Sequence, residues 1–166
     1  MSVDLEVDAS LKLSNLYVDS DDLSAARGNL FLSWTDELAD GTGTDQADLL
    51  WYDSRTANAA VDDLDLAGSL TDAFGNTLTF VEVRGLYIRN KDSANPLAIG
   101  AAAANPVASI FSDTSDEIIV RAGGVLFLWS PLNGGYTIGA GASDILRIDP
   151  GANSIDYDIV IIGTSA

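Results

Sequence analysis

Short runs of apolar residues, separated by turn-forming residues, follow one another along most of the chain. The runs are rich in Val, Ile, Leu and aromatic residues, which is typical of β-strands. Turn formers separate them, for example at Gly28-Asn29, Asp40-Gly41, Gly75-Asn76 and Gly123-Gly124. No segment keeps an apolar stripe of helical period beyond a turn or two. The pattern predicts an all-β chain, an antiparallel β-sandwich of the jelly-roll kind with residues 1–166 in a single domain.

Individual strands differ in how many of their faces are apolar. Leu30, Leu32 and Trp34 alternate with more polar neighbours, which predicts one apolar face and one mixed face. Residues 125–129 and 157–162 are apolar on both faces, so each run needs a cover on its second face as well. Either a long loop or the N-terminal segment covers them, or a neighbouring subunit does. The predicted core or interface anchors are Phe74, Trp129, Ile159 and Ile161.

The alternation changes phase around Gly85. Val81 and Val83 share one face before it, whereas Leu86 and Ile88 carry the apolar positions after it. One extra residue in the strand would restore the alternation, and this is what a β-bulge supplies. The alternative is a long strand with both faces half-buried. A bulge would also bend the strand so that it contributes to both sheets.

Composition narrows the chemistry more than it identifies a function. The 166 residues contain no His and no Cys, which excludes disulfides, thiol catalysis, and His-dependent nucleophiles or zinc sites. The formal charge of −17 offers no surface for nucleic acid. No secretory signal or membrane-spanning run is evident, so synthesis in the cytoplasm and no membrane partner are expected. The main strand framework is predicted over residues 48–163, with residues 1–15 as a docking arm.

The acidic residues suggest two candidate sites, neither with a specific pattern. Asp19 and Asp21, and Asp40 with Asp45, lie in acidic turns whose oxygens suit Ca²⁺, but the EF-hand spacing is absent. Solvated turns are the usual outcome, so no metal and no cofactor are expected. Among 25 carboxylates some pair always resembles a glycosidase dyad, so the residues do not predict an enzyme. The three tryptophans, Trp34, Trp51 and Trp129, are expected in the core, with a sugar-stacking platform as the alternative.

Several segments of the second two-thirds of the chain resemble small virion proteins of tailed bacteriophages with jelly-roll or sandwich folds. They are WYDSRT at 51–56, DLAGSLTDAFG at 65–75, VRGLYIRN at 83–90, VRAGG at 120–124 leading to Pro131, DILRI at 144–148 and YDIVIIG at 157–163. The resemblance covers about residues 48–163 and consists of strand cores and turns, without catalytic residues.

This resemblance implies a head-decoration, or cement, protein on the outer surface of the capsid. Such a protein would form a homo-oligomer, with a trimer favoured, and would bind the major capsid protein and stabilise the shell. The acidic charge fits an outer position, because packaged DNA would repel it inside. Two other functions remain open: a tail or receptor-binding module that binds glycans, and an enzyme of the carboxylate type.

Overall fold

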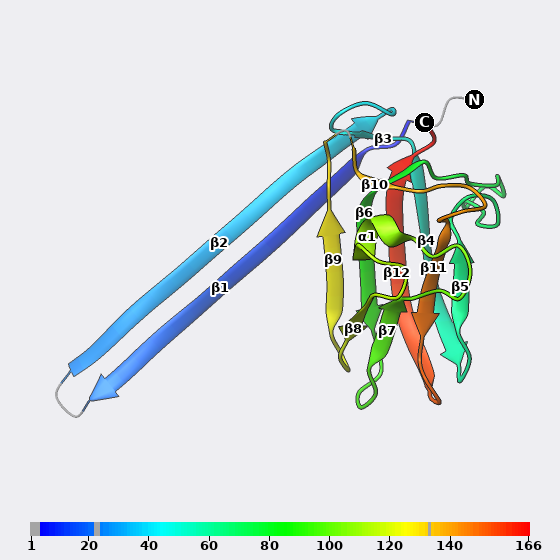
Figure 1. Cartoon of the computed structure of the whole chain (residues 1–166). Coiled ribbons are helices and arrows are strands. Elements are labelled where there is room, and N and C mark those ends of the chain that lie inside the picture. Colours follow the sequence, from blue (N-terminus) through cyan, green and yellow to red (C-terminus); the bar gives the residue numbers. More distant parts are fainter. Residues whose placement is uncertain (1–3, 22–23, 133) are drawn as a thin grey trace.

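The computed structural model describes the backbone of residues 4–21, 24–132 and 134–166, and side chains outside residues 17–27 within these ranges. It confirms the all-β prediction: antiparallel sheets pack into a sandwich, and a long two-stranded hairpin projects from it (Figure 1). In the described residues the one α-helix is a single turn, α1 (Ala108–Phe111), so none is long or apolar enough to cross a membrane.

The first sheet is built around two central strands. β6 (Glu82–Asn90) and β12 (Ser154–Thr164) pair with each other along most of their length. β4 (Leu49–Asn58) extends the sheet beyond β12, while β9 (Val125–Trp129) and β10 (Tyr136–Thr137) pair with the other edge of β6. This sheet carries the outer surface discussed below.

The second sheet closes the sandwich. Its strands run in the order β5 (Asp62–Asp65), β11 (Ile145–Asp149), β7 (Leu97–Gly100) and β8 (Glu117–Val120). Alternate residues of both sheets point inward, because successive side chains of a strand lie on opposite faces. The buried cluster includes Ile159 and Ile161 of β12, two of the predicted core or interface anchors, and both are fully buried.

The predicted bulge exists, and the unpaired residue is Arg84. Ile162 pairs with Gly85 and Gly163 pairs with Val83, so the register of β12 skips one residue of β6. The Arg84 side chain is buried, forms an ion pair with Glu82 at 2.7 Å, and donates to the carbonyl oxygens of Pro131 and Leu132. The expectation that β6 contributes to both sheets is wrong, because its partners β9, β10 and β12 all belong to one sheet. The bulge joins β6 to the loop after β9 instead.

The N-terminal part of the chain forms the projecting hairpin, here called the arm. β1 (Val7–Asp21) and β2 (Ser24–Asp40) pair without a register shift from Val7–Leu38 to Asp21–Ser24. Fifteen residues of antiparallel strand span about 50 Å. The turn predicted at Gly28-Asn29 is wrong: both residues lie inside β2, because cross-strand pairing continues past them. At its base, β2 also pairs in parallel with β3 (Gln46–Ala47).

Candidate functional site: the arm, its joint and the outer sheet face

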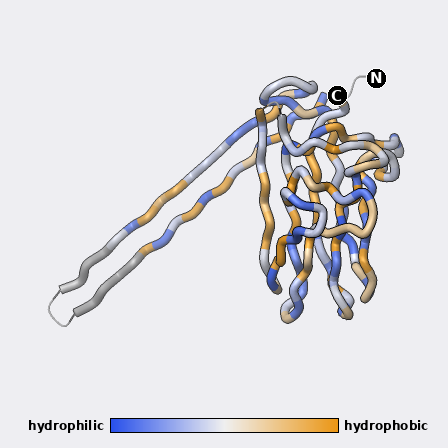
Figure 2. The backbone as a smooth tube through the Cα atoms, in the orientation of Figure 1, coloured by the Kyte–Doolittle hydropathy of each residue, from blue (hydrophilic) through white to orange (hydrophobic). Residues whose placement is uncertain are grey.

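The arm has one apolar side and one largely polar side. The register places Leu11 opposite Trp34, Leu13 opposite Leu32, and Asn15 opposite Leu30. These side chains share one side because residues two apart on a strand point the same way. We call Leu11, Leu13, Leu30, Leu32 and Trp34 the arm face. Figure 2 shows apolar positions recurring along both strands of the arm.

The arm face is largely open to solvent. Leu11, Leu13, Leu30 and Leu32 are 56, 57, 46 and 53% exposed, and none of the four belongs to either buried cluster of the sandwich. An isolated two-stranded hairpin is marginally stable in water, and contiguous exposed apolar surface commonly marks a contact with another molecule. The opposite side carries Asp8, Lys12 and Glu37, together with the exposed Phe31 and Leu16.

An aromatic joint holds the base of the arm against the first sheet. The Trp34 ring meets the rings of Phe127 and Trp129 edge-on, at centroid distances of 6.2 and 5.8 Å. Nε1 of Trp129 donates a hydrogen bond of 2.8 Å to Oδ2 of Asp36 on β2. Trp129 is thus an anchor between arm and sandwich. Trp34 and Trp129 are half-buried, so of the three tryptophans expected in the core Trp51 alone is fully buried.

Gly85 makes room for this joint. A Cβ atom at Gly85 would lie 3.0 Å from Cζ3 of Trp129 and 3.2 Å from Cδ1 of Ile162. The absent side chain therefore lets the indole ring lie close to β6. The change in apolar alternation seen in the sequence at Gly85 thus coincides with the neighbouring bulge and with the position where the Trp129 ring packs on β6.

The outer face of the first sheet is covered at one end only. Leu38 of β2 and Ala47 of β3 pack on Ile162 in a second buried cluster. Of the covers expected for residues 157–162, the N-terminal part of the chain therefore supplies one, over Ile162. The cover ends there: Val125 and Phe127 of β9 are 53 and 39% exposed.

Next to this cover, four apolar or aromatic side chains form a row across the sheet. The register aligns Tyr52 with Val160, Val160 with Tyr87, and Tyr87 with Phe127. We call these four residues the sheet belt. Tyr52 is well exposed and the other three are partly exposed. The belt continues the apolar surface of the joint across the sandwich.

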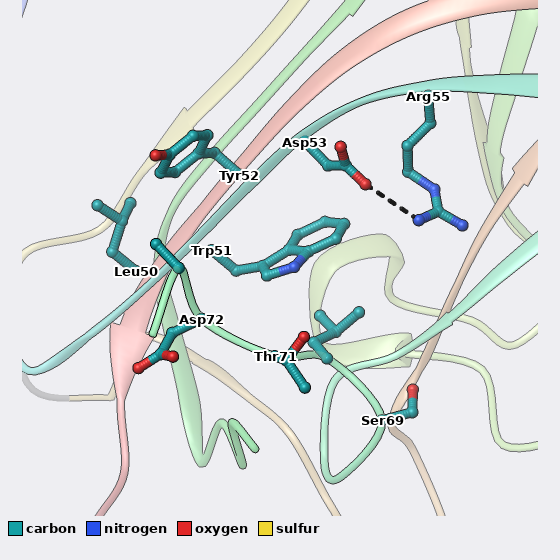
Figure 3. Close-up of a pocket in the computed structure, with 10 residues that line it drawn as sticks. Leu50, Trp51, Tyr52, Asp53, Arg55, Ser69, Thr71 and Asp72 are labelled. Carbon is teal, nitrogen blue, oxygen red and sulfur yellow. Dashed lines mark hydrogen bonds and ion pairs between the residues drawn. The ribbon is translucent and has the colours of Figure 1, made fainter. Parts of the chain in front are cut away.

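A shallow depression of about 350 Å³ lies at the free edge of β4 (Figure 3). Trp51 points to its floor beside the loop that carries Ser69 and Thr71, whereas Tyr52 points to the other side of the strand. Tyr52 and the exposed Phe74 line a neighbouring depression together with Asp72. Phe74 is therefore not a core anchor within the chain, and its part in an interface stays a prediction.

Asp72, which lines both depressions, and Asp62, which is bonded to the lining residue Arg55, are engaged in structural hydrogen bonds. Asp72 accepts hydrogen bonds from Asn76 and from the backbone of Phe74, and these bonds, that from the Asn76 side chain foremost, lower its pKa. Both oxygens of Asp62 accept from the Arg55 guanidinium at 2.8 and 3.0 Å, and the Tyr157 hydroxyl donates to Asp62 at 2.7 Å. A general acid needs the opposite, a raised pKa.

The hydrogen bond between Asp62 and Tyr157 shifts the pKa values of both groups, in opposite directions. Burial acts to raise the pKa of Asp62, but the hydrogen bonds from Arg55 and Tyr157 outweigh it, so its pKa lies below the usual value. Burial, followed by the bond to Asp62, raises the pKa of Tyr157. The group therefore stays an Arg–carboxylate pair with a neutral phenol, which ties β4 and β12 to β5.

The acidic turns proposed for Ca²⁺ do not converge in the part of the chain that the structure describes. No group of three or more acidic residues is close enough to hold a metal ion among those residues. Asp40 accepts a hydrogen bond from the backbone of Leu5, and the backbone of Asp45 donates to Pro131. The side chains of Asp19 and Asp21 lie outside the described residues.

The sequence analysis did not predict that the arm face, the joint and the belt form one surface. The alternation at residues 30–34 indicated an apolar strand face, but no pattern indicated which residues of β1 pair with that strand. Comparison with protein-family models, curated proteins and solved structures finds no match for this chain.

Proposed function

We propose that this protein is a structural component of a tailed-phage virion, a head-decoration protein bound to the outer surface of the capsid. The observation that carries the proposal is the arm: about 50 Å of hairpin with an exposed apolar face, attached to a well-packed sandwich. A protein that acts alone gains nothing from such a projection, whereas an assembly component uses it to reach a neighbour.

Two further features support an assembly role. The sheet belt gives the sandwich an apolar contact surface of its own, available to a capsid subunit. The charge of −17 keeps exposed parts of neighbouring particles apart, so the apolar surfaces can be used for specific contacts without general aggregation. Several modest contacts joined in one homo-oligomer dissociate slowly, which suits a clamp across capsid subunits.

The test is to add the purified protein back to capsids that lack it. We expect it to co-sediment with these particles and to raise the temperature at which they release DNA. The variant Tyr52→Ser, on the belt, should bind the particles less well, whereas Ser69→Ala, away from the belt, should bind as the wild type does. Recovery of the protein with tails alone would contradict the proposal.

One observation favours a second function, that of a tail or receptor-binding module. Two exposed aromatic rings, Tyr52 and Phe74, line one depression beside the polar side chains of Asp72 and Asn76. Aromatic faces beside hydrogen-bonding groups suit the stacking of a sugar ring. Binding of host glycans that is lost in both Tyr52→Ala and Phe74→Ala would favour this function over decoration.

A further inference from the structure

The arm is one layer of a sandwich whose second layer is missing from the described chain. Two-layer β-structures bury the apolar face of one sheet against that of another, about 10 Å away. In the arm, the apolar face has no such partner: Leu13 and Leu32, opposite each other in the register, remain more than half exposed. Something outside this chain has to supply the second layer.

The exposed area is large enough for a stable interface. The chain exposes 9341 Å², whereas a compact monomer of 17.4 kDa exposes about 7,900 Å². The excess of roughly 1,400 Å² is shared between the two sides of the arm. About 700 Å² therefore remains for the arm face, which lies within the roughly 600–1,000 Å² that each partner contributes to a standard stable interface. The arm, which stands away from the sandwich, accounts for the elongated shape (Figure 1).

Charge restricts the choice of partner. The five residues of the arm face are uncharged, although the chain carries 25 acidic residues. Asp36, on the same side at the base, is already bonded to Trp129. Among the described side chains, a basic partner would therefore find no unbonded carboxylate on this side, whereas an apolar partner would find aliphatic surface. The described charged side chains Asp8, Lys12 and Glu37 lie on the other side of the arm.

We infer that the second layer is the arm face of a second copy of this chain, so that two arms pack face to face around a two-fold axis. The surface is self-complementary, as such an axis requires, because each arm offers the same aliphatic residues to the other. Stacking the apolar faces turns Asp8 and Glu37 of both copies outward into solvent. The result is a four-stranded, two-layer structure that joins two sandwiches.

This inference rests on the assembly role proposed above but not on a virion. It assigns the arm face to a second copy and leaves the sheet belt for another partner. It also predicts an even number of copies, in contrast to the trimer that the resemblance favours. Failure of self-association and failure of particle binding are separate results, so the two proposals can fail independently.

The first test is the mass of the full chain in solution, measured by light scattering at about 100 μM in about 0.05 M and about 0.5 M NaCl. We expect a dimer or a multiple of it, favoured by salt, because salt screens the repulsion between two acidic chains. The variant Leu13→Ser with Leu32→Ser should raise the dissociation constant at least about 100-fold. The control Leu16→Ser with Phe31→Ser, on the opposite side of the arm, should associate as the wild type does.

The second test uses the absence of cysteine in the chain. A single Leu13→Cys variant should form a covalent dimer with a short bismaleimide, whereas Ser14→Cys, on the other side of the arm, should not. Circular dichroism of each variant checks that the sandwich is folded. A monomer under both salt conditions, a trimer, or equal dissociation of the two double variants would overturn the inference. The inference would also be overturned if the protein were a monomer and the variant Leu13→Ser with Leu32→Ser lost only its binding to particles.

Discussion

The joint between the arm and the sandwich allows a quantitative prediction for Trp129→Ala. The change removes the aromatic contact with Trp34, worth about 0.5–1.5 kcal/mol, and a hydrogen bond to the Asp36 carboxylate worth about 1.5–3 kcal/mol. Because Trp34, Trp129 and Asp36 are all half-buried, about half of this sum applies, roughly 1.5 kcal/mol. Local opening at the base of the arm should become about 10-fold more frequent.

Hydrogen–deuterium exchange with mass spectrometry measures this opening. The Leu13→Ser, Leu32→Ser background is used, so that pairing of arms does not protect the amides. Backbone amides of residues 34–38 should exchange about 10-fold faster in Trp129→Ala, and those of β12 much less so. The control is Tyr52→Ala, on the same face of the sheet but outside the joint. Equal acceleration in β12, or no change at the arm, would refute the idea that this joint holds the arm.

Three further predictions concern the sandwich. Ile159→Ala should lower the free energy of unfolding in urea by about 2–5 kcal/mol, and Phe74→Ala by less than about 0.5 kcal/mol, because Ile159 is buried and Phe74 is exposed; similar losses would contradict this placement. Asp62→Asn should cost about 2 kcal/mol at neutral pH. The pKa of Asp62 in the folded protein lies below its ordinary 3.8. The extra stability of the wild type over Asp62→Asn is therefore complete above about pH 4 and is lost as the pH falls through the folded pKa, so the urea midpoints of the two proteins should converge in acid. A difference in midpoint that stays constant with pH would argue against ionisation as the cause. Gly163→Ala should lower the melting temperature sharply, since its Cβ would lie 2.1 Å from the carbonyl oxygen of Glu82; wild-type melting would mean that the bulge opens freely.

Local pattern was sufficient for the fold class and for much of the core. The alternation in β2, the bulge beside Gly85 and the burial of Ile159 and Ile161 each follow from spacing within a few residues. Such features are local because a strand has a period of two, and one inserted residue reverses it. The prediction of a turn at Gly28-Asn29 was wrong because it used the local signal alone. Pairing with residues of β1 more than ten positions away keeps both residues in the strand.

The candidate surface depended on contacts that no local pattern specifies. Trp34 and Trp129 are 95 positions apart, and they meet because β9 pairs with β6 and the arm leaves the sandwich beside it. The belt exists only because four strands align Tyr52 and Phe127 in one row. Likewise, an apolar residue is written the same way whether its neighbours cover it or leave it open, so Phe74, which lies in a turn, and Ile159, which lies in β12, were both predicted as anchors. Which of these faces is covered is decided by the arrangement of the sheets, because burial is a property of the neighbours that a side chain acquires when the whole chain folds.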